Sequence, residues 1–288
     1  MEEDQANKTM PAEEEVVGGL NKFLCINNTK DGRDVNLEEL EEILGYKFNN
    51  KRLLEEAFTH ASALKTSNSS STSFSSSSSS YERLEFVGDA VLSLLISREH
   101  YFLYPDLSSG PLTRLRSSNV DTEKLARVAV KHGLHRFLRH NKPKLEDEIR
   151  KFIQEISEFP LHSNGLIDVP KDLADIVESA IGAVFIDSDS SLDIVWKVFK
   201  SLLEPIISPE TIKRHPVTEL YEICQKNNLK VQFVDLWKKN TGFDVYVQDK
   251  LIGSATYGLK KEIAHNRAAK DALNNIGRVL SEKYSIQG

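Results

Sequence analysis

Residues 82–90 read Glu-Arg-Leu-Glu-Phe-Val-Gly-Asp-Ala, and this stretch places three carboxylates in a segment that is otherwise largely apolar. On a helix that turns 100° per residue, Glu82, Glu85 and Asp89 lie within about a sixth of a turn of one another. Carboxylates on one helix stripe repel one another and are costly to desolvate, so they need a positive partner. A divalent cation is one such partner. A solvated helix face paired with nearby lysines or arginines is the alternative.

Residues 171–184 contain a second acidic pair, because Asp175 and Glu178 are three residues apart and share a helix face. Their neighbours are again apolar or small. Two buried helices with inward acidic edges would form a carboxylate-lined pocket, and hard oxygen ligands of this kind suit Mg²⁺. Without a phosphate-binding glycine loop, such a site favours metal-assisted hydrolysis of a phosphodiester.

Length and composition allow one large domain or two ordinary ones, since the chain has 288 residues and is 40% hydrophobic. The formal net charge is −6, but residues 1–214 carry −9 and residues 215–288 carry +3. Basic charge concentrated at the C-terminal end predicts a separate binding module there.

The two cysteines, Cys25 and Cys224, do not make a disulfide framework, which favours a reducing compartment. No apolar run approaches the ~18 residues that a membrane span requires. The N-terminus begins Met-Glu-Glu-Asp, whose charge is unlike that of a secretory or organellar leader. We therefore expect a protein of the nucleus, the cytoplasm or both, with no membrane segment.

The chain divides into four regions by composition and periodicity. Residues 1–34 are polar, acidic and aperiodic, which is typical of a disordered tail. Residues 35–205 follow helical spacing and predict an all-α domain, interrupted by a flexible serine-rich insert at 67–80. Residues 206–214 form a proline-bracketed linker. Residues 215–282 show a helix, three alternating strands and a second helix, so we expect a small α+β module.

Individual boundaries can also be predicted within the helical region. Gly45 is expected to stop the first helix, and a second helix is expected to begin at Asn50. The first acidic stretch should lie on a helix from about residue 81 to residue 101. The second should begin a helix after Pro170, since proline favours the first helical turn.

The run at 82–90 resembles the signature motif of the ribonuclease III family. Residues 170–179, Pro-Lys-Asp-Leu-Ala-Asp-Ile-Val-Glu-Ser, resemble the second acidic motif of that family in its Dicer-like form. Residues 44–48 and 57–62 are similar to the opening helices of the family domain. Residues 215–282 resemble a double-stranded-RNA-binding domain. The resemblance implies an all-α ribonuclease III domain followed by an α-β-β-β-α RNA-binding domain, the layout of plant members with one of each.

This resemblance implies an endoribonuclease that cleaves double-stranded RNA by Mg²⁺-dependent hydrolysis, with Mn²⁺ as an alternative metal. The implied products carry 5′-phosphate and 3′-hydroxyl ends with short 3′ overhangs, and the implied role is in RNA processing or RNA silencing. By position, the metal ligands are Glu82, Asp89, Asp175 and Glu178, with Asp89 and Glu178 catalytic. Lys171 matches a family lysine that could neutralise the scissile phosphate; as an exposed lysine at a helix start it would do nothing.

The resemblance also implies a homodimer, because one catalytic domain holds one site and cuts one strand. Glu85 matches a family position at the subunit interface and is interpreted as structural support. Phe86 matches a residue that is exposed for contact with the second subunit. Plain core packing is the alternative for an apolar side chain in such a helix.

Duplex contacts are implied for the first helix of the module, its first loop between strands and the start of its last helix. The matching residues are Thr218, Glu222, Lys238, Lys239, Lys260, Lys261, His265 and Arg267. Glu262 and His265 stand where the family commonly has lysines, which predicts weak phosphate binding. Cys224 is either buried and inert or faces the RNA, where oxidation would block docking.

Two other functions fit parts of the sequence. The first is a non-cleaving protein that sequesters double-stranded RNA or modulates a Dicer-like enzyme. The second is a metal-free helical scaffold, which Mg²⁺ would not stabilise. Four intact carboxylates in apolar helices favour the nuclease over both.

Overall fold

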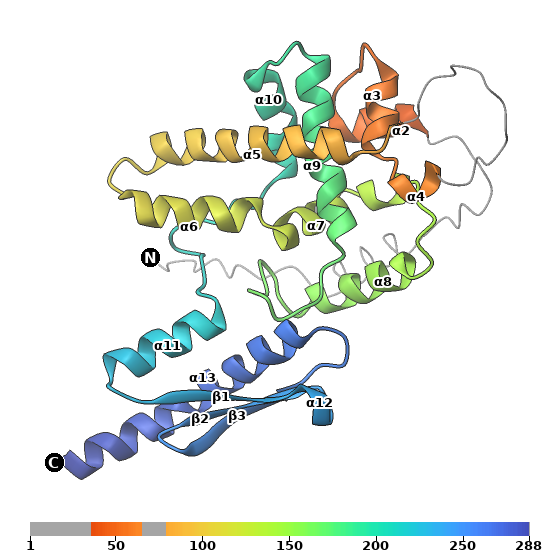
Figure 1. Ribbon diagram of the computed structural model, residues 1–288. Helices are drawn as coiled ribbons and strands as arrows, with labels where there is room; N and C mark the ends of the chain where they lie inside the picture. The colour runs from red at the N-terminus through yellow and green to blue at the C-terminus, as the bar shows by residue number, and fades with distance from the viewer. Residues whose placement is uncertain (1–35, 65–78, 288) are drawn as a thin grey trace, which may run out of the picture.

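The computed structural model describes residues 36–64 and 79–287, with side chains up to Ser281. These residues form a helical domain and a smaller C-terminal module with a three-stranded sheet (Figure 1). The expected tail at 1–34 and most of the serine-rich insert at 67–80 lie outside the described residues. Within the described part of the chain, no helix has the length and apolar character that crossing a bilayer requires.

The regular elements described in the helical domain are all helices, which confirms the predicted all-α class. They are α2 (Leu37–Leu44), α3 (Lys51–Ala57), α4 (Ala61–Leu64), α5 (Glu82–Leu103), α6 (Ser109–Val120), α7 (Thr122–Lys131), the 3-10 helix η1 (Leu134–Phe137), α8 (Leu145–Ile156), α9 (Lys171–Asp187) and α10 (Leu192–Leu202).

Local signals set several of these boundaries where the sequence predicted them. Gly45 ends α2 with φ of 65°, a left-handed conformation that glycine adopts without steric strain. The Asn50 side chain accepts a hydrogen bond from the backbone N–H of Arg52 at 3.2 Å and so caps the start of α3. Pro170 immediately precedes α9. These predictions are confirmed, and α5 extends two residues beyond its expected end.

Helix α9 is the central helix of the domain. Its apolar residues from Leu173 to Val184 are buried on all sides, as expected for a helix enclosed by others. It contacts α3, α5, α7 and α10. Any polar side chain on its inner surface is therefore held in a fixed, partly desolvated position.

Helices α5 and α9 cross at two glycines, near the centre of the domain in Figure 1. A Cβ atom added to Gly88 would lie 1.8 Å from the carbonyl oxygen of Glu178. One added to Gly182 would lie 2.1 Å from the carbonyl oxygen of Leu84. The two backbones thus touch directly, and the acidic residues that flank Gly88 come next to those of α9.

The C-terminal module has the predicted α+β class, with one short helix that the sequence did not indicate. Its elements are α11 (Pro216–Lys226), β1 (Val231–Leu236), α12 (Trp237–Asn240), β2 (Gly242–Val247), β3 (Lys250–Thr256) and α13 (Lys261–Gln287). The strands pair antiparallel in the order β1-β2-β3. Helix α13 packs on the sheet through small residues, Ala264, Ala268, Ala269 and Ala272, and also contacts α11.

The module contacts the helical domain through the start of α13. The Arg267 side chain donates to the carbonyl oxygen of Leu166 at 2.7 Å, and Asn266 donates to that of Gly165 at 2.9 Å. Lys260 forms an ion pair with Asp168 at 2.5 Å. The loop before α9 is therefore the docking point for the last helix.

Candidate metal centre and nucleic-acid interface

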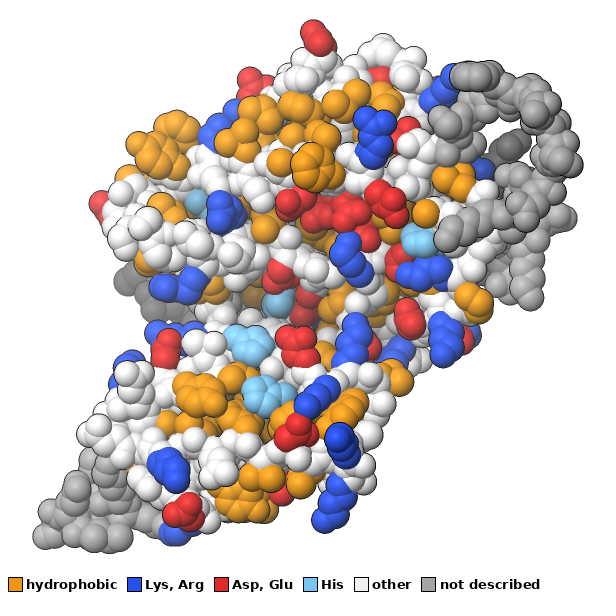
Figure 2. Space-filling view, in the orientation of Figure 1, with side chains coloured by type: hydrophobic (Ala, Val, Ile, Leu, Met, Phe, Trp, Pro, Cys, Tyr) orange, Lys and Arg blue, Asp and Glu red, His pale blue; other side chains and the backbone are white. Residues whose placement is uncertain are grey.

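A cavity of about 380 Å³ lies where α5 and α9 cross, and its wall is strongly acidic. Figure 2 shows acidic side chains gathered at the middle of this face, with a hydrophobic patch beside them over α5. The lining residues are Glu82, Glu85, Phe86, Asp89, Thr122, Lys171, Ala174, Asp175 and Glu178. All four carboxylates that the sequence assigned to metal thus reach one cavity.

Three carboxylates form the tightest group in this cavity: Glu85, Asp175 and Glu178. Each offers one oxygen atom, and these atoms lie within 4.8 Å of one another. Asp175 is buried, whereas Glu85 and Glu178 are half-buried. Hard, partly desolvated oxygen atoms at this spacing fit a divalent cation such as Mg²⁺.

The sequence assigned Glu82 to the metal and Glu85 to structural support, and the structure places Glu85 in the tight group while Glu82 lies outside it. Glu85 precedes the Gly88 crossing by about one helical turn, so it lies beside Asp175 and Glu178. Glu82 lies one further turn away, at the exposed start of α5, and accepts a bond from the Ser80 hydroxyl at 3.2 Å. It lines the cavity without joining the tight group.

Burial and like charge both act on Glu178. Burial, followed by the charges of Asp89, Asp175 and Glu85, raises the pKa of Glu178 to about 8. Burial likewise raises the pKa of Asp175, with Glu85 adding to the effect. Asp89 therefore acts electrostatically with the tight group although its oxygen atoms lie outside it. A bound cation would relieve the repulsion that raises the pKa of Asp175 and Glu178.

Lys171 is the first residue of α9 and its side chain is 66% exposed, as the helix-start alternative requires, but it also has acidic partners. Its ammonium group lies 2.9 Å from Glu85 Oε1 and 2.5 Å from Asp175 Oδ1, inside the acidic cavity. Burial lowers the pKa of Lys171, but its hydrogen bonds to Asp175 and Glu85 outweigh this and leave the pKa raised. Lys171 is thus a protonated counterion of two candidate ligands.

Sequence reasoning missed a buried carboxylate, Asp172, which lies about one turn before Asp175 on α9 and does not line the cavity. It is 5% exposed and bonds Lys142 at 2.6 Å. Burial raises the pKa of Asp172, yet the bond to Lys142 more than reverses this, so the group stays charged. The signal was present, because Asp172, Asp175 and Glu178 repeat at intervals of three along one helix.

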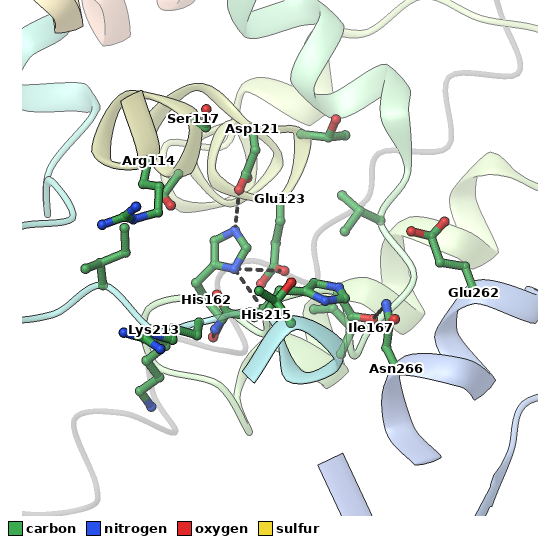
Figure 3. Close-up of a pocket in the computed structure, with 18 of the residues that line it drawn as sticks. Arg114, Ser117, Asp121, Glu123, His162, Ile167, Lys213, His215, Glu262 and Asn266 are labelled. Carbon is green, nitrogen blue, oxygen red and sulfur yellow. Dashed lines mark hydrogen bonds and ion pairs between the residues drawn. The ribbon is translucent and has the colours of Figure 1, made fainter. Parts of the chain in front are cut away.

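A second cavity, of about 1010 Å³, lies between the helical domain and the module. His162 stands between Asp121 and Glu123 on its wall (Figure 3), with Nε2 2.7 Å from the Asp121 carboxylate. The backbone N–H of Asn164 donates to Nδ1 at 2.9 Å, so Nε2 carries the proton. His162 therefore connects the start of α7 to the loop before α9, and that loop is the one on which α13 docks. Thr218, a predicted RNA contact, lines this cavity.

Several cations predicted to bind phosphate are already paired within the protein. Lys260 pairs with Asp168, and Lys261 pairs with Asp235 at 2.5 Å. Arg267 bonds the helical domain through Leu166 and also pairs with Glu155 at 3.4 Å. The partners of Lys260 and Arg267 lie in the helical domain and depend on docking between the two parts of the chain, whereas Asp235, the partner of Lys261, lies on β1 of the module itself.

The other predicted RNA contacts fall into three kinds. Glu222 forms an ion pair with Arg214 on the exposed side of α11. The His265 ring packs against Phe233, with ring centroids 4.3 Å apart. Lys238 and Lys239 lie exposed on α12, and the described residues include no ion-pair partner for them.

Cys224 is buried in the core of the module, with 1% exposure, and burial raises the pKa of its thiol. A buried neutral thiol cannot face the RNA, so the structure contradicts the redox hypothesis and supports the inert alternative. The helical period explains this, because Cys224 lies four residues after Leu220, which is also buried.

Exposed apolar side chains lie along α5, and Figure 2 shows a hydrophobic patch over this helix. Phe86 is 79% exposed at the rim of the acidic cavity. The same helix exposes Leu94, Tyr101, Phe102 and Leu103. Large apolar residues that share one surface commonly mark a protein contact.

Comparison with known proteins gives consistent matches for both parts of the chain. Residues 82–189 match the model for the Ribonuclease III domain, and residues 216–276 match the Double-stranded RNA binding motif. Ribonuclease 3-like protein 3 of Oryza sativa subsp. japonica is 51% identical over 247 residues, which cover 85% of this chain and 80% of that protein.

A longer relative and a solved structure match as well. Endoribonuclease Dicer homolog 1 of Oryza sativa subsp. japonica is 45% identical over 258 residues, covering 87% of this chain but 13% of that protein. The nuclease domain of ribonuclease III from Campylobacter jejuni aligns with 27% identity and a TM-score of 0.44, covering 59% of this chain and 98% of that domain.

Proposed function

The chain belongs to the ribonuclease III family, and on that premise we propose that it hydrolyses double-stranded RNA with Mg²⁺ as its cofactor. The observation that supports this most is the meeting of Glu85, Asp175 and Glu178 in one acidic cavity. Asp89 adds its charge to the same group. A protein that only bound RNA would gain nothing from carboxylates held this closely, since their repulsion weakens the fold.

The proposed chemistry assigns separate tasks to the residues of the cavity. A bound Mg²⁺ or Mn²⁺ would supply an activated water and neutralise charge on the phosphate. Glu85, Asp175 and Glu178 would hold the cation, and Glu178 would release its proton as the cation binds. Lys171 would be freed from the carboxylates it now pairs with. The proposed products are 5′-phosphate and 3′-hydroxyl ends with short 3′ overhangs.

The two domains would act on one duplex. The module matches a double-stranded-RNA-binding motif, and Lys238 and Lys239 are its exposed candidates for phosphate contact. A-form RNA is recognised mainly by its shape and backbone, so no base-specific contact is needed. RNA processing or silencing is the proposed setting.

The cleavage assay is direct. The purified full-length protein is incubated with a long RNA duplex in Mg²⁺, in Mn²⁺ and in EDTA, beside the unpaired strand of the same sequence. We expect shortening of the duplex only with metal, and end mapping should give 3′ overhangs. A duplex that is retained but stays intact in both metals would instead support a non-cleaving binding protein.

Dimerisation is proposed through the exposed apolar face of α5, because one cavity cuts one strand and two cavities are needed for both. We expect Phe86→Ser to raise the dimer dissociation constant about tenfold or more, since a central aromatic contact would be lost. The side chain is 79% exposed, so the fold should be unaffected. Sedimentation velocity over a concentration series measures the effect.

Leu251→Ser is the matched control, because Leu251 is 54% exposed but lies on β3 of the module. It should leave the dimer unchanged. A monomeric parent protein, or a dimer that Phe86→Ser does not weaken, would contradict the proposed interface.

A further inference from the structure

A buried hydrogen-bonded chain lies directly behind Asp175. Tyr81 is 3% exposed, and its hydroxyl lies 3.2 Å from Asp175 Oδ2 and 3.3 Å from Asp172 Oδ1. The hydroxyl has one proton to donate, so the two carboxylates share it. Lys142 donates to the other oxygen of Asp172 at 2.6 Å. The chain therefore runs from Lys142 through Asp172 and Tyr81 to Asp175.

Two backbone segments hold this chain in place. The backbone N–H of Tyr81 donates to the carbonyl oxygen of Thr59 at 2.9 Å. The His60 ring accepts the backbone N–H of Ser62 at Nδ1, so Nε2 carries the proton and points to Asp172 Oδ1 at 3.4 Å. The starts of α5 and α9 are thus joined to the turn after α3 and to the loop before α8.

The two carboxylate oxygens of Asp175 have different hydrogen-bond partners. Oδ2 accepts from Tyr81 on the buried side, while Oδ1 faces Lys171, which also bonds Glu85. A carboxylate fixed at one oxygen cannot rotate freely about its terminal bond. The oxygen on the side of Glu85 is then held ready for a ligand.

We propose that Tyr81 and Asp172 are positioning residues for the metal centre, acting through Asp175. This inference rests on the proposed function, because it requires that Asp175 bind a cation. Neither residue lines the acidic cavity, so neither would touch the metal. Outer groups that orient a metal ligand typically change metal affinity about 10–100-fold when they are removed.

Tyr81→Phe tests the proposal, because it removes the hydroxyl and keeps the ring. The probe is Mn²⁺ alone, added to the full-length protein without RNA, and the free ion is measured by electron paramagnetic resonance. We expect the Mn²⁺ dissociation constant to rise about 10-fold or more. The Mg²⁺ concentration for half-maximal cleavage should rise in parallel.

Tyr46→Phe is the matched control. Tyr46 also donates to an aspartate of α9, Asp187, at 2.9 Å. Asp187 lies 12 residues from Asp175, about 18 Å along the helix. The control loses the same kind of bond in the same helix, and its Mn²⁺ affinity should equal that of the parent.

A second substitution, Asp172→Asn, keeps the proposal testable if Tyr81→Phe fails to fold. It removes the charge that Lys142 and Tyr81 share, and it should also weaken Mn²⁺ binding about 10-fold. The double variant should be no weaker than the weaker single variant, since both act through Asp175. Additive losses would contradict a single chain.

The outcomes separate this inference from the proposed function. If the parent protein does not bind Mn²⁺, both the proposed function and the positioning roles are contradicted. A parent that binds Mn²⁺, together with folded Tyr81→Phe and Asp172→Asn variants of unchanged affinity, overturns the positioning roles alone. A lower melting temperature with unchanged affinity would likewise assign both residues to the fold only.

Discussion

Glu178→Gln is expected to reduce the rate of duplex cleavage at saturating Mg²⁺ by about a thousandfold or more. The substitution keeps the size of the side chain but removes the charge of one of three carboxylates that meet within 4.8 Å. A metal that counters charge in the transition state contributes several kcal/mol, and about 4 kcal/mol corresponds to a thousandfold in rate. Single-turnover cleavage of a short duplex measures this loss.

Glu82→Gln is the informative comparison, because Glu82 lines the same cavity outside the tight group. We expect its effect on the rate to be much smaller than that of Glu178→Gln. Equal losses in the two variants would restore Glu82 to the metal set and would contradict the geometric grouping.

Glu178→Gln should also change how the stability of the protein depends on pH. The folded-state pKa of Glu178 is about 8, above the ordinary glutamate value of about 4.3 in an unfolded chain. The folded form therefore holds a proton that the unfolded form has released, and stability falls as pH rises from about 4.3 to about 8. Glu178→Gln cannot ionise and should escape this loss.

Without metal, Glu178→Gln should thus be more stable than the parent at pH 8, on the order of 2 kcal/mol after allowance for solvent screening. The difference should be small near pH 5 and should shrink again in saturating Mg²⁺. Urea unfolding at several pH values measures it. A constant difference across this range would contradict the raised pKa.

Gly182→Ala is expected to destabilise the protein by about 3 kcal/mol and to disrupt the metal centre. Its Cβ would lie 2.1 Å from the carbonyl oxygen of Leu84, so the helix backbones must separate. Overpacking of this kind typically costs about 1–3 kcal/mol, occasionally more, whereas alanine gains only about 1 kcal/mol over glycine in helix propensity. The clash is with backbone atoms, so we place the loss at the upper end.

Separation of α5 from α9 would also move Glu85 away from Asp175 and Glu178, so Mn²⁺ affinity should fall with stability. Gly277→Ala is the control, since nothing lies within 4 Å of its Cβ on α13. That variant should gain up to about 1 kcal/mol. Urea unfolding of both variants measures the change in stability. A Gly182→Ala variant that stays stable and binds metal would contradict the direct backbone contact.

The sequence predicted the acidic stripes but not which of their members meet. Helical period alone groups Glu82, Glu85 and Asp89 on one side of α5. The choice between Glu82 and Glu85 depends on where α9 crosses, and that point is set by Gly88 and Gly182. A glycine inside each acidic helix was the available signal, because such a residue often allows close approach of two backbones.

Other differences between the predictions and the structure also arise from contacts between residues that are far apart in the sequence. Local sequence patterns predicted the helix boundaries at Gly45 and Asn50 and the order of elements in the module. Such patterns suffice because helix caps and strand alternation depend on residues only a few positions apart. The partners of Lys260 and Arg267 lie about a hundred residues away, and no local pattern encodes them. Asp172 was overlooked because its neighbour Asp175 already accounted for the acidic motif.

The ion pairs that hold α13 to the helical domain give ionic strength two opposing effects. Added salt screens the attraction of the module for RNA phosphates, and it equally screens the pairs of Lys260 with Asp168 and Arg267 with Glu155. Salt therefore releases basic groups from the protein while it weakens their hold on the duplex. Binding should consequently tolerate changes in electrolyte better than the number of basic residues on the module would suggest.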